Sequence, residues 1–222
     1  MMKYRSAFDI IGPVMIGPSS SHTAGAARIG RVARTLFEKQ PTKAVIHLYG
    51  SFAKTYKGHG TDLALVAGIM DFDTFDERIP DALKIAEEVG LEVEFIEEDA
   101  VTEHPNTVRI NLFDGKGKEL EIVGISIGGG TIEITEINSF KLKLSGANPA
   151  ILVVHQDRFG LISSVTTVLS RYQINIGHME VSRKEKGDIA VMVIEMDHKL
   201  DESVVSELNA LEGVTQVIRL VN

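Results

Sequence analysis

The sequence predicts an α+β protein built from two domains. Its 222 residues exceed the roughly 100 to 150 residues of a common single domain. The first two thirds mix helical periodicity with alternating strands, and a second pattern of order βαββαβ begins near residue 150. The turn-forming residues 145–149 (SGANP) separate the two patterns, so we expect domains at residues 1–145 and 148–222.

In the first domain, apolar residues at spacings of three and four predict a helix over 25–39. A helix over 61–70 is apolar nearly all round, which indicates burial on most sides. Pro80 and Gly90 bracket a short helix over 81–89, because proline favours the first helical position and glycine the position after the end. Alternating apolar and polar residues predict five strands, at 44–49, 92–96, 108–113, 119–125 and 131–137, with a hairpin turn at 114–118.

The second domain shows a complete supersecondary pattern. We expect strands at 150–154, 174–182, 189–196 and 214–221, and helices at 160–172 and 201–211. A split βαβ arrangement of this order forms a ferredoxin-like, four-stranded antiparallel sheet with both helices on one face.

Composition narrows the classes of function. With 44% hydrophobic and 24% charged residues the chain is typical of soluble globular proteins. A net charge of −8 with scattered lysines and arginines argues against a nucleic-acid partner. No apolar run reaches the roughly 18 to 20 residues of a membrane span and no signal peptide is present, so we expect a cytoplasmic protein without a membrane partner. The absence of cysteine excludes disulfides, thiolate nucleophiles and an iron-sulfur cluster held by this chain alone.

The first candidate motif is the segment 17–25 (GPSSSHTAG), a hydroxyl-rich loop that leads directly into a helix. A helix N-terminus presents unpaired amides and the positive end of its dipole, so it can hold a carboxylate or phosphate. In the alternative interpretation one serine caps the helix and the others are solvated. Three hydroxyls, from Ser19, Ser20 and Ser21, followed by His22 and Thr23, exceed what a cap needs.

The second candidate motif is the segment 57–62 (KGHGTD), in which two glycines let the backbone approach a ligand. We expect His59 at the start of the buried helix, where the helix dipole favours the neutral, base-competent imidazole. The alternative is a loop histidine without function. Two further segments, 103–107 (EHPNT) and 126–130 (SIGGG), are weak when taken singly, because proline commonly shapes turns and glycine triplets commonly form flexible connections.

Taken together and in this order, the segments resemble one family, the β chain of iron-sulfur-dependent L-serine dehydratases. The matching text is GPSSSHTAG, YGSFAKTYKGHGTD, HPNTV and SIGGG, and it covers most of residues 5–145. The resemblance implies an N-terminal domain similar to allosteric substrate-binding domains, and a two-chain enzyme whose cysteine-containing α subunit holds a 4Fe-4S cluster. The lack of cysteine here fits that division. Where some relatives read GHHTD, this chain has Gly60, so any role of a second histidine is lost.

The resemblance also implies a reaction, the conversion of L-serine to pyruvate and ammonia. An iron of the partner chain acts as a Lewis acid on the serine hydroxyl while a base removes the α-proton, and the aminoacrylate that forms is then hydrolysed. His59 is implied as the base and His22 as a second catalytic group. The implied substrate-binding residues are Ser19, Ser20, Ser21, Thr23, Thr61, Asp62, His104, Asn106, Gly128 and Gly129.

Other cofactor chemistries find no support in the sequence. No lysine stands in the S-x-K context of pyridoxal-phosphate dehydratases, which bind their cofactor through a Schiff base. The seven histidines show no HExxH or paired helical spacing, so we expect no metal site in this chain.

The segments 155–161 (HQDRFGL) and 173–177 (QINIG) resemble an ACT domain, which covers residues 148–222. The resemblance implies an amino-acid effector bound by His155, Asp157, Gly160 and Asn175, with a neighbouring chain closing the site. Relatives often have proline in place of Phe159 and asparagine in place of Asp157. The alternative is a domain used for dimerisation alone, and in either case an exposed sheet edge favours a homodimeric contact.

A second function class stays open at this point. The N-terminal loops can instead form a serine pocket without chemistry, as in a non-catalytic amino-acid-sensing subunit. The two hypotheses diverge over a general base, which only catalysis requires.

Overall fold

The structure is a computed structural model that describes residues 13–220. Contacts within the chain divide it into two units, Met1–Asn138 and Ser139–Asn222. The division lies a few residues before the segment 145–149 that we expect to link the domains, and the boundaries 1–145 and 148–222 stay predictions. Each unit is described by itself.

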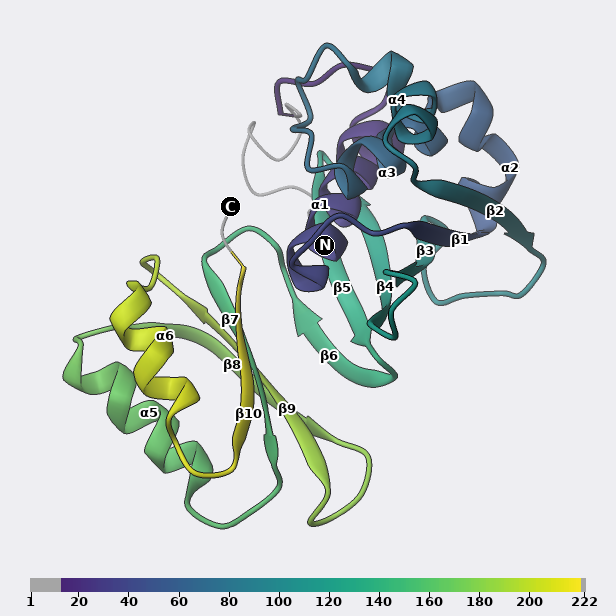
Figure 1. The fold of residues 1–222 in the computed structure, drawn as a ribbon. Coiled ribbons are helices and arrows are strands. Elements are labelled where there is room, and N and C mark those ends of the chain that lie inside the picture. Colours follow the sequence, from purple (N-terminus) through teal and green to yellow (C-terminus); the bar gives the residue numbers. More distant parts are fainter. Residues whose placement is uncertain (1–12, 221–222) are drawn as a thin grey trace, which may run out of the picture. The chain divides into compact units, whose positions relative to one another are not determined.

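The first unit combines five strands with helices (Figure 1). Its elements are a π-helical turn η2 (Ser20–Ala24), α1 (Gly25–Phe37), β1 (Lys43–Tyr49), α2 (Gly50–His59), α3 (Thr61–Ile69), η3 (Ile79–Asp81), α4 (Ala82–Glu88), β2 (Glu92–Glu98), β3 (Thr107–Phe113), β4 (Glu119–Gly128) and β5 (Thr131–Ile137). The strands lie in the order β2-β1-β3-β4-β5. The β1–β2 pair is parallel and the other pairs are antiparallel.

Helix α1 contacts β3, β4 and β5 of the sheet, and it also packs against α3. Two glycines bring α1 and α3 into backbone contact. A Cβ on Gly68 would lie 2.1 Å from the carbonyl oxygen of Ala27, and a Cβ on Gly30 would lie 2.4 Å from that of Leu65. Because α3 also contacts α2 and α4, it is buried over most of its length, as its uniformly apolar sequence predicts.

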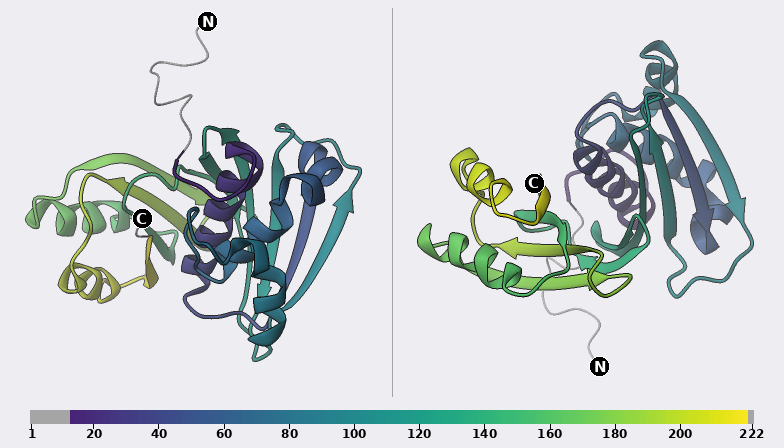
Figure 2. Two further views of the ribbon diagram at one scale, coloured as in Figure 1. Left: turned by 90° about the horizontal axis from the view of Figure 1, so that it is seen from above. Right: turned by 60° about the horizontal axis from the view of Figure 1, so that its bottom comes forward.

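The second unit begins with β6 (Phe140–Leu144) and continues with the expected order β7 (Ala150–Gln156), α5 (Leu161–Arg171), β8 (Ile176–Arg183), β9 (Ile189–Met196), α6 (Glu202–Asn209) and β10 (Val214–Leu220). The last four strands form a sheet of order β10-β7-β9-β8, antiparallel at every pairing. Helices α5 and α6 lie side by side on one face of this sheet (Figures 1 and 2). The predicted βαββαβ, ferredoxin-like fold is therefore confirmed.

Helix α2 and strand β6 are absent from the sequence-based prediction, and the turn η2 forms where a loop is expected. Helix α2 has only one fully buried residue, Phe52, and contains Gly58, so its sequence gives little helical periodicity. Strand β6 is five residues long and follows the tight turn at Asn138 and Ser139, whose φ angles are 47° and 63°. Within residues 13–220, none of the helices has the length and apolar character needed to cross a bilayer.

Candidate functional site

The serine loop forms the beginning of a continuous helix. Ser19 has the extended conformation of a cap, and its Oγ accepts the backbone N–H of His22 at 3.1 Å. The carbonyl oxygen of Ser19 accepts the N–H groups of Thr23 and Ala24 at 2.8 and 3.4 Å. One serine therefore acts as the cap, and the other hydroxyls are left for other contacts.

The imidazole of His22 lies at the centre of the candidate site. Its Nδ1 lies 3.0 Å from Ser21 Oγ, and its Nε2 lies 3.0 Å from Ser51 Oγ. The ring contacts Phe52 and His59 edge-on, at centroid distances of 5.3 and 4.8 Å. Burial lowers the pKa of His22, and the neighbouring His59 lowers it further. The ring is therefore neutral near pH 7 and able to accept a proton.

The predicted position of His59 at the start of a helix is wrong. The segment before it is helical, so His59 is the last residue of α2, and Gly60, with φ 65°, separates α2 from α3. His59 therefore does not lie in the first turn of the buried helix α3, which begins at Thr61. The Nδ1 atom of His59 is buried and has no hydrogen-bond partner among the described residues.

Helix α2 explains how the site is assembled, and it reveals a residue that the sequence analysis did not single out. Ser51 and His59 are eight residues apart, so both lie on one face of α2. His22 contacts the hydroxyl of the first and the ring of the second. A helical interpretation of the segment would have placed Ser51 on the face that carries His59, together with Phe52 and Thr55.

The segment containing His104 and Asn106 is attached to the start of α2. Ser51 donates its backbone N–H to the carbonyl oxygen of Pro105 at 2.7 Å. The approach requires Gly50, because a Cβ there would lie 2.6 Å from the same oxygen and the φ angle is 53°. The Nδ1 atom of His104 accepts the backbone N–H of Asn106 at 3.2 Å, so this nitrogen supports its own turn.

The segment 126–130 reaches the site through its serine. Ser126 is fully buried, and its hydroxyl donates to the carbonyl oxygen of Ser21 at 2.8 Å. Asn106 Nδ2 donates to the carbonyl oxygen of Ser126 at 3.2 Å, and Ser126 returns its N–H to the carbonyl oxygen of Asn106 at 3.0 Å. Gly128 is the last residue of β4 and Gly129 begins the turn to β5, and the described contacts do not bring them to the histidine pair.

The remaining predicted residues support the backbone around the pair. The hydroxyl of Thr23 donates to the carbonyl oxygen of His59 at 3.1 Å, and Ser20 accepts the N–H of Gly25. Asp62 lies in the first turn of α3, as predicted, and accepts the N–H of Leu63 at 2.9 Å. Thr61 is fully buried, and its hydroxyl has no hydrogen-bond partner among the described residues.

An open groove runs along α2 and includes His59 in its lining. It is lined by residues 53–59, including Lys54, Lys57 and His59, and by Glu97 of β2. Gly58 has open space where a side chain would stand, so the backbone is accessible there. Two lysines beside an imidazole suit an anionic, proton-donating ligand such as an amino acid.

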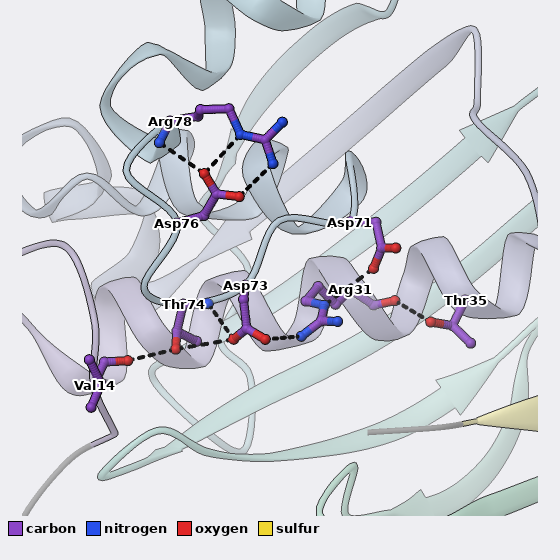
Figure 3. A network of polar contacts seen from close by, with 8 residues as sticks. All are labelled: Val14, Arg31, Thr35, Asp71, Asp73, Thr74, Asp76 and Arg78. Atoms are coloured by element: carbon purple, nitrogen blue, oxygen red, sulfur yellow. Dashed lines mark hydrogen bonds and ion pairs between the residues drawn. The ribbon is translucent and has the colours of Figure 1, made fainter.

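A polar network fixes the segment that enters the serine loop (Figure 3). Arg31 of α1 binds the carboxylates of Asp71 and Asp73, with N···O distances of 3.3 and 2.8 Å. The hydroxyl of Thr74 donates to the carbonyl oxygen of Val14 at 2.8 Å, and the N–H of Ile16 donates to the carbonyl oxygen of Thr74 at 2.8 Å. The loop after α3 therefore holds residues 14–16 in place.

In the second unit, three predicted effector residues lie at one end of the sheet. His155 is 2% exposed; its Nδ1 lies 2.9 Å from the carbonyl oxygen of Gln156, and its Nε2 has no hydrogen-bond partner among the described residues. Gly160, with φ 85° and open space around it, precedes α5. The N–H of Gly187 and the Arg183 guanidinium hold the Asp157 carboxylate and lower its pKa.

Asn175 lies at the other end of the same sheet. Asn175 comes directly before β8, and the first residue of β8 pairs with Met196 at the C-terminal end of β9. The last residue of β7, next to His155, pairs with Ile189 at the opposite end of β9. The amide of Asn175 donates to Asp197 at 2.7 Å. Within one chain, Asn175 is therefore separated from the other three residues by the length of the strands.

The donor atoms of this chain do not fit an iron-sulfur cluster. Such clusters are held mainly by cysteine thiolates, and the sequence contains no cysteine. Among residues 13–220, no three histidine or carboxylate side chains gather as metal ligands do.

Comparison with known proteins identifies the family of this chain. The model of the family "Serine dehydratase beta chain" matches residues 6–88, and that of the ACT domain matches residues 150–213. A protein of Bacillus subtilis (strain 168) named probable L-serine dehydratase, beta chain, is 61% identical over 99% of both chains. The L-serine dehydratase beta chain of Peptoniphilus asaccharolyticus is 37% identical over 95% of both chains. L-serine dehydratase 2 of Escherichia coli (strain K12) is 35% identical over 57% of this chain and 33% of its own length. The resemblance read from the four motifs is thus confirmed: the chain belongs to the serine dehydratase beta chain family and carries a C-terminal ACT domain.

Proposed function

We propose that this chain is the β subunit of an L-serine dehydratase, an L-serine ammonia-lyase that forms pyruvate and ammonia. The observation that carries the proposal is the meeting of His22 and His59, whose rings come from two separate motifs and lie 4.8 Å apart. Ser19 and Ser21 contact the first ring, and His59 is one of the residues that line the groove along α2. The names of the two relatives that match over nearly the whole chain support the same activity.

In the proposed reaction, L-serine loses its α-proton and its hydroxyl group. The base His59 takes the α-proton, and the hydroxyl group leaves as water with an equivalent proton, so that L-serine loses one H2O and becomes aminoacrylate. Its imine tautomer is then hydrolysed by one water to pyruvate and ammonia. His22, whose pKa is lowered by burial and by the neighbouring His59, lies beside this proposed base. The remaining predicted residues of the first unit, including Gly128 and Gly129, are proposed to bind or surround the substrate.

A partner chain is part of the proposal. A cysteine-containing α subunit holds the 4Fe-4S cluster, since this chain offers no thiolate ligands. The longer L-serine dehydratase 2 matches this chain over only 33% of its own length. The remainder of that enzyme supports the need for a second component beside this chain. The purified β subunit alone is expected to form no pyruvate from L-serine.

We also propose that the ACT unit binds an amino-acid effector through His155, Asp157, Gly160 and Asn175. A buried imidazole nitrogen without a partner and an open helix start at Gly160 are features suited to a small polar ligand. Because Asn175 lies at the opposite end of the sheet, a site containing all four residues requires a second copy of the chain. Exposed Met179 and Val181 on the outer strand β8 support a homodimeric contact there.

The test replaces the proposed base. His59→Ala, coexpressed anaerobically with the cysteine-containing chain, is expected to lower turnover of L-serine by about 10²- to 10⁴-fold while the two chains still assemble. His198→Ala, which removes an exposed histidine from the second unit, serves as the matched control with unchanged turnover. Near-normal pyruvate formation by His59→Ala would contradict catalysis by this residue and favour the non-catalytic sensing subunit.

A further inference from the structure

Ser51 has no part in the function proposed above, yet it is bonded to the central imidazole. We propose that Ser51 is a positioning residue of the histidine pair: its hydroxyl holds Nε2 of His22 and decides which nitrogen of that ring carries the proton. The consequence for turnover rests on the proposed function, whereas the arrangement itself is testable without any activity.

The hydroxyl of Ser51 is held in place by its surroundings. Its backbone N–H donates to Pro105 at 2.7 Å, and its carbonyl oxygen accepts the Thr55 hydroxyl at 2.7 Å one turn further along α2. Gly50 permits the close approach of the Pro105 carbonyl. The segment containing His104 and Asn106 therefore sets the position of the Ser51 side chain relative to His22.

The proposed direction of the hydrogen bonds starts from the hydroxyls on the other side of the ring. Ser19 Oγ already accepts the backbone N–H of His22, and its own proton can be donated to Ser21 Oγ at 3.3 Å. Ser21 then donates to Nδ1 of His22 at 3.0 Å. In this proposed arrangement Nδ1 is the acceptor. Because a neutral imidazole has one donor and one acceptor nitrogen, Nε2–H then donates to Ser51 Oγ.

This direction leaves the hydroxyl proton of Ser51 free for a ligand. The described contacts give the His22 ring no carboxylate or guanidinium partner, and the titratable group beside it is His59 of α2. Two hydroxyls at opposite nitrogens therefore orient the ring, and the loss of one lets it rotate. A rotated ring presents the wrong nitrogen to the site.

The direct test observes the ring nitrogens of His22 by ¹⁵N NMR in the full-length chain. The wild-type protein is expected to show the Nε2–H tautomer. Ser51→Ala is expected to populate both tautomers, and Ser51→Thr, which keeps a hydroxyl, to restore the wild-type signals. A wild-type Nδ1–H tautomer, or spectra of His22 that do not change in Ser51→Ala, would overturn the inference.

The kinetic test uses the two-chain enzyme. Ser51→Ala is expected to lower kcat about 10- to 100-fold with little change in KM, because a misplaced group slows the reaction more than it weakens binding. Losing the Ser51 acceptor also disfavours the protonated ring, so the acid limb of the kcat profile moves to lower pH, by about half a pH unit. Ser51→Thr is expected to recover both.

Thr35→Ala is the matched control, since its hydroxyl bonds only a carbonyl of its own helix, that of Arg31 at 2.9 Å. It should leave kcat and the pH profile unchanged. Wild-type kcat and pH profile in Ser51→Ala would overturn the inference. If the wild-type two-chain enzyme itself forms no pyruvate, the proposed function fails, and the NMR measurement still decides the role of Ser51.

Discussion

Replacing Gly25 with alanine tests whether the first helix must touch the buried serine of β4. Gly25 has helical φ and ψ angles, but a Cβ there would lie 2.1 Å from Ser126 Oγ and 2.9 Å from Ser126 Cβ. The alanine gains about 1 kcal/mol in helix propensity. Overpacking costs about 1–3 kcal/mol, and the displaced hydroxyl loses its hydrogen bond to Ser21, worth about 1 kcal/mol.

The net destabilisation of Gly25→Ala is therefore about 2 kcal/mol, which lowers Tm by roughly 5–10 °C for a unit of this size. Calorimetric unfolding of the full chain measures it. Adding Ser126→Gly removes the obstructing atoms, so in that background the alanine should cost nothing. Gly58→Ala, at a helical position with open space, is the matched control and should not destabilise. A wild-type Tm for Gly25→Ala would refute the reasoning.

Two further predictions concern regulation and acid stability. Asn175→Ala is expected to change cooperativity or the response to an amino-acid effector while leaving the basal turnover intact; unchanged regulation in steady-state kinetics would favour a dimerisation-only role. The pKa of Asp114 is lowered chiefly by its hydrogen bond with Lys39 and further by backbone N–H groups of the β3–β4 turn. The charged carboxylate therefore stabilises the fold at pH values above the ordinary carboxyl pKa. This stabilisation is lost as the pH falls through the lowered pKa of the folded state. Asp114→Asn should therefore have a lower Tm than wild type at pH 7, with the difference shrinking below about pH 4 in a series of melting curves; a pH-independent difference would contradict this.

The elements with strong periodicity were predictable from the sequence, and the weakly patterned one was not. Helix α1 and the whole βαββαβ unit have apolar residues at regular spacing because one face of each element is buried. Helix α2 buries little besides Phe52, so tertiary contacts rather than its own pattern stabilise it. Its glycines favoured a loop interpretation, and this misplaced His59.

The candidate site was predictable as a set of motifs but not as a geometry. The sequence indicates the hydroxyls and the two histidines, since each motif combines turn residues with polar groups. It does not indicate which hydroxyl faces which ring nitrogen, because that depends on how α2 meets Pro105 and on how Ser126 meets Ser21. Such contacts join residues more than 50 positions apart and leave no local signal.

The placement of Ser51 and His59 on one helix restricts how this region can evolve. Each residue added to or removed from a helix rotates everything beyond it by about 100° and moves it by about 1.5 Å. A single insertion or deletion between Ser51 and His59 would turn one of them away from His22, although most substitutions between them would not. Functional members of the family are therefore expected to keep the length of this interval more strictly than its composition.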